Sequence, residues 1–76
     1  MNCTIDGMYD SLSVVMPAHN EQDNIQRSIE AFSMYERYVT QFEIIVVDDG
    51  STDKTAELVL ESQKKYKFLR LISLPH

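Results

Sequence analysis

Three apolar runs predict the strands of a small sheet. Residues 12–16 form a short β-rich run that Pro17 ends, because proline fixes its own φ and offers no ladder donor. Residues 42–47 are nearly continuously apolar and include four consecutive β-branched side chains, a pattern typical of a parallel strand covered on both faces. Residues 68–74 are rich in Leu, Ile and Phe, and they predict a third strand.

The stretch between the first two runs has helical periodicity. Ile25, Ile29 and Phe32 fall at i, i+4 and i+7, so they share one face of a helix. We expect Asn20 to cap this helix and Tyr38 to lie near its end. The apolar face of this helix is predicted to cover the sheet.

A second amphipathic stretch follows residues 51–53, whose Ser, Thr and Asp side chains can each cap a helix. The element order is therefore β-α-β-α-β, which predicts an α/β fold with a parallel sheet, because the helical crossovers are long enough to return each strand in the same direction. The two helix-entering loops, residues 17–21 and 48–51, then share the carboxyl edge of the sheet. Open α/β sheets bind their ligands at that edge.

The composition is that of a small globular unit. The chain has 76 residues, 43% of them hydrophobic, and we expect a flexible lead-in over the aperiodic residues 1–11 and one domain over residues 12–76. A net charge of −5 argues against nucleic-acid binding, which usually needs a basic face. A single cysteine, Cys3, and the absence of a run of ~20 apolar residues favour a cytoplasmic protein without a membrane span in this chain.

Acidic side chains gather at the predicted carboxyl edge, with Glu21 in the first loop and Asp48 and Asp49 in the second. Carboxylates there suit a divalent cation or a ligand that offers hydrogen-bond donors, such as a nucleobase or a ribose. The only glycines, Gly7 and Gly50, cannot form a dinucleotide-binding G-x-G-x-x-G motif or a P-loop. The two acids are adjacent, whereas an aspartyl phosphatase would separate them by one residue.

Two segments resemble motifs of the family 2 glycosyltransferases. Residues 14–21, VVMPAHNE, resemble an opening motif of three apolar residues followed by P-x-x-N-E. Residues 44–55, IIVVDDGSTDKT, are similar to the family segment hhVVDDGSxDxT, in which h is apolar. The similarity extends over residues 11–76. It implies the first part of a GT-A fold, the fold of nucleotide-diphospho-sugar transferases, and a UDP- or GDP-sugar as donor.

The resemblance also implies roles for individual residues. Pro17, His19 and Glu21 match positions around the base and the ribose, and Asp49 matches the residue that hydrogen-bonds the base. His19 stands where tyrosine is more usual, so we expect a weaker stacking contact. Asp48 is expected to support the second loop. The nucleotide site implied by the resemblance consists of Pro17, Ala18, His19, Glu21, Asp48 and Asp49.

The remainder of the family's site is expected downstream of this chain. The resemblance implies Mg²⁺ or Mn²⁺ in the full-length enzyme, held by a downstream D-x-D motif, and a downstream catalytic base, so neither catalytic nor metal-binding residues are assigned here. We therefore expect a truncated domain that binds the nucleotide sugar but does not transfer the sugar by itself. The full-length enzyme is expected to use a hydroxyl or a polyprenyl-phosphate acceptor, in the latter case at the cytoplasmic face of a membrane.

Structural roles compete with these assignments. Asp48 and Asp49 can form an Asx-type turn and a helix cap, and Glu21 can complement a helix dipole. His19 is equally compatible with an exposed loop. The alternative function is a non-catalytic α/β module that forms a homo-oligomer or pairs with another chain, because the last predicted strand has no following helix and leaves a sheet edge and a face uncovered.

Overall fold

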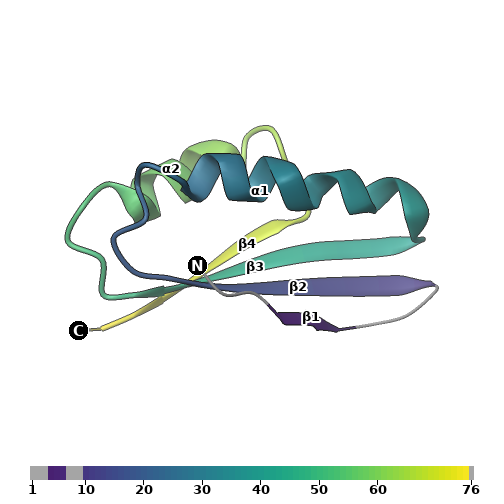
Figure 1. The fold of residues 1–76 in the computed structure, drawn as a ribbon, viewed down its shortest axis with the longest axis horizontal. Coiled ribbons are helices and arrows are strands. Elements are labelled where there is room, and N and C mark those ends of the chain that lie inside the picture. Colours follow the sequence, from purple (N-terminus) through teal and green to yellow (C-terminus); the bar gives the residue numbers. More distant parts are fainter. Residues whose placement is uncertain (1–3, 7–9, 76) are drawn as a thin grey trace.

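A four-stranded sheet carries helices on one of its faces (Figure 1). The computed structural model describes residues 4–6 and 10–75. None of the helices in this part of the chain is long and apolar enough to cross a membrane. The elements are, in chain order, β1 (Thr4–Asp6), β2 (Ser11–Ala18), α1 (Ile25–Ser33), the 3₁₀-helix η1 (Met34–Tyr38), β3 (Gln41–Asp49), α2 (Thr55–Ser62) and β4 (Leu69–Leu74).

The strands β2, β3 and β4 run parallel to one another and neighbour one another in the sheet. Their register pairs Ala18 of β2 with Asp48 of β3, and Asp49 of β3 with Leu74 of β4. The three strands therefore end at one edge of the sheet, and their order with α1 and α2 confirms the predicted α/β class.

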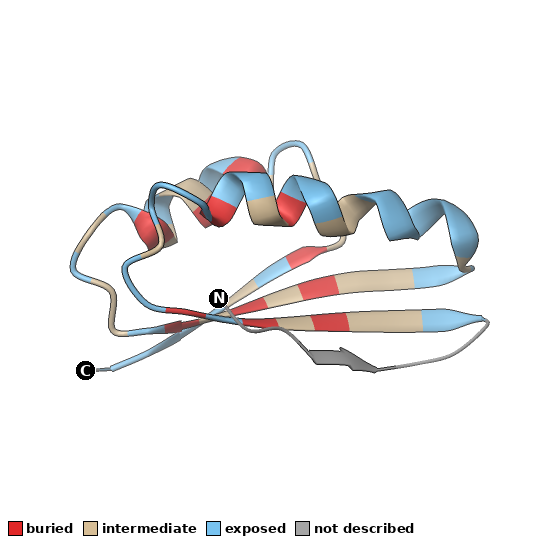
Figure 2. Ribbon diagram, in the orientation of Figure 1, coloured by how far each residue is buried: buried red, intermediate tan, exposed pale blue. Residues whose placement is uncertain are grey.

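Every second residue in the central parts of β2 and β3 is buried beneath the helices (Figure 2). Because successive side chains of a strand point to opposite faces, this alternation marks the face that forms the core. Met16 and Ile44 from the sheet and Ile25 and Ile29 from α1 are fully buried in one cluster. Phe32 is partly buried and packs against the same cluster, so the predicted apolar face of the first helix is confirmed.

In the part of the chain that the structure describes, no helix lies on the opposite face of the sheet (Figure 1). Since β2, β3 and β4 follow one another across the sheet, two crossovers of the same hand place α1 and α2 on the same side. Ile45 and Val47 of β3 are half-buried on the helix-free face, and Ile72 and Leu74 of β4 are exposed there. The prediction that the central strand is covered on both faces is therefore wrong for the described residues.

The segment expected as a flexible lead-in contains a strand. Thr4 pairs with Val15 and Asp6 with Ser13, so β1 lies antiparallel to β2, and Ser11 already belongs to β2. Residues 1–3 and 7–9 lie outside the described part of the chain. The physical reason for β1 is the edge of β2, whose backbone groups would otherwise lack strand partners.

The first helix begins later than its predicted cap. Asn24 is the N-cap of α1, whereas Asn20 has a φ of 51° and lies in a turn before the helix. The helical segment ends at Tyr38 through the 3₁₀-turn η1, as predicted. The Asn20 side chain bonds to the loop after β3 instead, so it caps a different segment.

Candidate functional site

The loops after β2 and β3 lie side by side at the carboxyl edge of the sheet (Figure 1). The pairing of Ala18 with Asp48 brings the ends of the two strands together, so both loops leave the sheet at neighbouring positions. The sequence-based prediction that residues 17–21 and 48–51 share one edge is confirmed.

Side-chain oxygens of residues 51–55, after β3, accept hydrogen bonds from the three consecutive amides of residues 20–22, after β2. A hydroxyl or carboxylate acceptor next to a chain turn satisfies donors that would otherwise need water. The bonds are Asn20 N to Ser51 Oγ (2.9 Å), Glu21 N to Thr55 Oγ1 (2.8 Å) and Gln22 N to Asp53 Oδ2 (3.2 Å).

The second loop returns the same kind of bond. Thr52 N and Asp53 N donate to Asn20 Oδ1 at 2.9 and 3.4 Å, and Lys54 N donates to Gln22 Oε1 at 3.1 Å. We call these reciprocal bonds between residues 20–22 and 51–55 the loop clasp. Because side-chain oxygens already occupy these six amides, a phosphate could bind them only by displacing the clasp.

A cavity of about 250 Å³ opens beside the clasp at the sheet edge. Asp49 is exposed and Glu21 is half-buried, so both carboxylates are accessible to a ligand. Pro17 and Ala18 supply an apolar wall at the end of β2. The lining residues are Pro17, Ala18, His19, Glu21 and Asp49. Five of the six predicted site residues are thus brought together in one place.

Asp48, the sixth predicted residue, lies beneath this surface. It is only 4% exposed and points to the helix-covered side, opposite to Asp49. Its Oδ1 accepts hydrogen bonds from the Ser51 amide at 3.3 Å and from the Ser51 hydroxyl. Gly50, with a φ of 65°, allows the chain to reverse between them. Asp48 therefore closes an Asx-type turn and does not line the cavity.

His19 connects the first loop to the backbone of Asp49. Its Nδ1 lies 2.7 Å from the Asp49 carbonyl oxygen, and since a carbonyl only accepts, Nδ1 carries the proton and donates. Nε2 then accepts from Asn20 Nδ2 at 3.4 Å. This arrangement is consistent with Asn20 Oδ1 accepting from the second loop. The imidazole ring is held at the mouth of the cavity by both contacts.

The pKa of Asp53, a residue of the clasp, is lowered by its hydrogen bonds. Partial desolvation raises this pKa, but the hydrogen bonds from the Thr55 hydroxyl, the Thr55 amide and the Gln22 amide lower it by more. The net result is a pKa below the ordinary 3.8. Bonds of this kind favour the charged form because the donors stabilise the carboxylate. Asp53 is therefore ionised near neutral pH and is available as an acceptor in the clasp.

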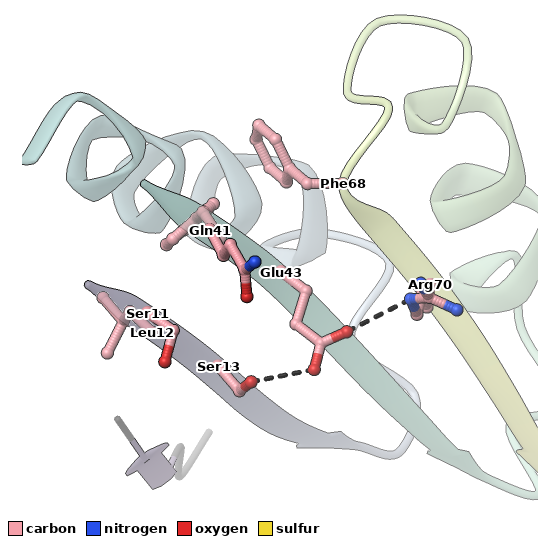
Figure 3. Close-up of a pocket in the computed structure, with 8 residues that line it drawn as sticks. Ser11, Leu12, Ser13, Gln41, Glu43, Phe68 and Arg70 are labelled. Carbon is pink, nitrogen blue, oxygen red and sulfur yellow. Dashed lines mark hydrogen bonds and ion pairs between the residues drawn. The ribbon is translucent and has the colours of Figure 1, made fainter. Parts of the chain in front are cut away.

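A larger cavity of about 360 Å³ lies at the opposite, amino end of the strands (Figure 3). Its lining includes Glu43, whose Oε1 accepts from Ser13 Oγ at 2.8 Å and whose Oε2 lies 3.2 Å from Arg70 Nε. Both carboxylate oxygens thus have protein partners, and the loops after the strands do not reach this end. Size therefore does not make it the better candidate.

The residues described by the structure contain no group of three or more His, Cys, Asp or Glu side chains placed to hold a metal ion. Glu21 and Asp49 face the same cavity, but they supply only two carboxylates. Divalent ions such as Mg²⁺ need six ligands, several of which can be water or substrate oxygens. The described residues therefore do not form a metal site of their own.

Neither Gln22 nor Thr55 was predicted to join the two loops, and Asn20 was assigned to the wrong helix start. Their contacts join positions 31–34 residues apart, which no local periodicity records. One signal was available. Residues 51–53 offer three side chains that can each cap a helix, although a single helix start needs only one.

The chain has clear similarity to known proteins. The sequence profile of the family described as Glycosyl transferase family 2 matches residues 13–76. A probable glycosyltransferase, YdaM, of Bacillus subtilis is 38% identical over 61 residues, which cover 80% of this chain and 14% of that protein. A dolichyl-phosphate beta-glucosyltransferase, ALG5D, of Trichomonas vaginalis is 37% identical over 71 residues, covering 86% of this chain and 22% of that protein.

A third relative has a different named substrate. An undecaprenyl-phosphate 4-deoxy-4-formamido-L-arabinose transferase of Yersinia enterocolitica is 47% identical over 49 residues, covering 63% of this chain and 15% of that protein. The chain therefore spans about a fifth or less of the length of these relatives. The matched segment holds both loops of the clasp, because the family profile begins at residue 13.

Proposed function

The chain belongs to the family 2 glycosyltransferases, and we propose that it forms the nucleotide-binding part of an enzyme that takes its sugar from a nucleotide-diphospho-sugar donor. The observation that carries this proposal is the cavity lined by Pro17, Ala18, His19, Glu21 and Asp49 at the carboxyl ends of β2 and β3. It combines residues of both family motifs at the edge where open α/β sheets bind their ligands.

Asp49 supplies the hydrogen-bond acceptor for the base. Its carboxylate is exposed, and an ionised carboxylate can only accept, so it selects a base edge that carries N–H donors. Uracil offers an imide N–H, and guanine offers a ring N–H beside an amino group. Together with the family resemblance, these donors support a UDP- or GDP-sugar, with Glu21 accepting from the ribose hydroxyls and the His19 ring lying against the nucleoside.

The diphosphate is held elsewhere. The clasp occupies six loop amides, and the residues that line the cavity include no lysine or arginine, so this lining does not neutralise two phosphates. Mg²⁺ or Mn²⁺, bound by residues outside this chain, would supply that charge in a full-length enzyme. This chain alone binds the nucleotide weakly and does not transfer the sugar.

The acceptor is a hydroxyl or a polyprenyl phosphate. Two relatives of this chain are named for dolichyl phosphate and undecaprenyl phosphate, which favours the second. Such an acceptor is anchored in a lipid bilayer, so a full-length enzyme of this type would work in the cytoplasm against the membrane surface. A free hydroxyl acceptor would need a base to remove its proton, whereas a phosphate acceptor is already anionic.

Calorimetry with UDP and GDP, with and without Mg²⁺ or Mn²⁺, tests this proposal. We expect weak binding, with a Kd of roughly 1 mM or somewhat below, and about tenfold weaker binding by Asp49→Asn, because one charge-assisted hydrogen bond is lost. Asp23→Asn is the matched control, since Asp23 is exposed and does not line the cavity. Equal affinities of the three proteins would contradict the assignment of Asp49.

The helix-free face supports a second candidate, a non-catalytic module that associates with a further chain. Ile72 and Leu74 are 47% and 44% exposed on that face, and β4 is the outer strand of the described sheet. Exposed apolar surface and an unpaired strand edge both favour association. This candidate predicts a concentration-dependent oligomer and no response to nucleotide.

A further inference from the structure

Asn20 has a backbone conformation that needs an explanation. Its φ of 51° lies in the left-handed region, and within the described residues no other non-glycine residue has a positive φ. Asparagine enters this region more readily than most residues, because its short side chain can bond locally, but the conformation still costs free energy. Its contacts with the second loop show what that conformation achieves.

Asn20 bonds to the second loop through both its backbone and its side chain. Its amide donates to Ser51 Oγ at 2.9 Å, and its Oδ1 accepts from Thr52 N at 2.9 Å and from Asp53 N at 3.4 Å. The Thr52 hydroxyl lies 3.4 Å from the same oxygen. One exposed residue therefore contacts three consecutive positions of the loop that follows Asp49.

These contacts reach Asp49 from two sides. On one side, Asn20 Nδ2 donates to His19 Nε2, and His19 Nδ1 donates to the Asp49 carbonyl. On the other side, Ser51, which accepts from the Asn20 amide, donates to the buried Asp48. His19 on one side of Asp49, and Ser51 with Asp48 on the other, are thus held by hydrogen bonds that begin at Asn20.

We propose that Asn20 is a positioning residue of the nucleotide site, and that it holds Asp49 at the cavity through the clasp. This inference rests on the function proposed above. Asn20 does not line the cavity and need not touch the ligand. Its effect is preorganisation, because a loop that is already ordered does not lose conformational entropy when the nucleotide binds. Loss of Asn20 Oδ1 should therefore weaken binding through Asp49.

Hydrogen exchange tests the clasp independently of any nucleotide. Asn20→Gly is the main variant, because glycine keeps the positive φ without strain and removes both side-chain groups, the Oδ1 acceptor for the second loop and the Nδ2 donor to His19. We expect the amides of Thr52 and Asp53 to exchange about tenfold faster or more, while Asn20→Asp, which retains an acceptor, keeps their protection. Asn24→Ala is the control, since Asn24 makes no side-chain cap bond. Unchanged exchange in Asn20→Gly would overturn the proposal.

A double-mutant cycle tests positioning against general stability. We expect Asn20→Gly to weaken the binding of UDP or GDP by about tenfold in the unaltered chain but by less than about twofold in Asp49→Asn, since coupled residues do not act additively. A merely structural role of Asn20 would weaken binding equally in both backgrounds, and this result would overturn the inference. Failure of the unaltered chain to bind either nucleotide, with Thr52 and Asp53 protected, would overturn the proposed function and the link to Asp49, and leave only the clasp itself.

Discussion

At the residue scale, two adjacent acids have opposite environments. Asp48 faces the helices and is buried, with Ser51 as its hydrogen-bond donor, whereas Asp49 faces the cavity and is exposed. Strand alternation alone separates them, because neighbouring residues of β3 point to opposite faces. Both acids were predicted to belong to the site, but Asp48 is buried and only Asp49 lines the cavity.

Asp53 makes the clasp sensitive to acid. Hydrogen bonds lower the pKa of Asp53 in the folded chain below 3.8, its ordinary value in the unfolded chain. The bonds that the carboxylate accepts therefore stabilise the folded loop fully at a pH above the unfolded-state pKa. This stabilisation is lost as the pH falls through the lower folded-state pKa. We expect the amide resonances of Gln22 and Thr55 to titrate with a midpoint below 3.8. In Asp53→Asn this transition should be absent. A midpoint at or above 3.8 would contradict the assignment.

At the element scale, the local sequence pattern was sufficient to predict a helix or strand whose own residues form an apolar face. The periodicity of Ile25 and Ile29 predicted the buried face of α1, and the apolar run in β3 predicted the central strand. The strand β1 was not predictable, because three residues are too few to establish an alternation and its formation depends on the free edge of β2. The clasp was missed for the same physical reason, since its bonds join loops that are distant in the sequence.

We expect isoleucine-to-valine substitutions on the two sides of the sheet to lower the free energy of unfolding by different amounts. Ile29 is fully buried, so Ile29→Val should lower the free energy of unfolding by about 1 kcal/mol, the usual cost of one buried methyl group. Ile72 is 47% exposed on the helix-free face, and Ile72→Val should change it by less than about 0.5 kcal/mol. Urea denaturation measures both. Equal costs would mean that the helix-free face is covered in solution.

At the scale of the whole molecule, one layer of helices covers one face of the sheet and leaves the other without a helix (Figure 1). Within the described sheet β4 is an outer strand, and β1 pairs with the edge of β2 on the other side. Relatives of this chain are several times longer, since the matched part is 14–22% of their length. The cavity at the carboxyl ends of the strands and the apolar helix-free face are separate features, and each needs an experiment of its own.

The exposed apolar face predicts self-association at high protein concentration. Ile72 lies on this face beside Val47, to which it is paired, and Ile72→Lys should shift sedimentation towards the monomer. Leu60→Lys is the matched control, because Leu60 is 52% exposed on α2 at the other side of the sheet. If both variants shift the equilibrium equally, or neither does, association does not use the helix-free face.

The most direct test of the nucleotide site is a map of amide shifts of the isotope-labelled chain during titration with UDP and then GDP. The account predicts perturbation at the amides of residues 18–21 and 48–51, which include the cavity lining apart from Pro17, which has no amide, and part of the adjoining clasp. The amides of Ser13, Glu43 and Arg70 at the opposite end should stay unchanged and serve as the internal control. Perturbation centred on those three residues, or no perturbation by either nucleotide, would contradict a nucleotide site at the carboxyl ends of β2 and β3.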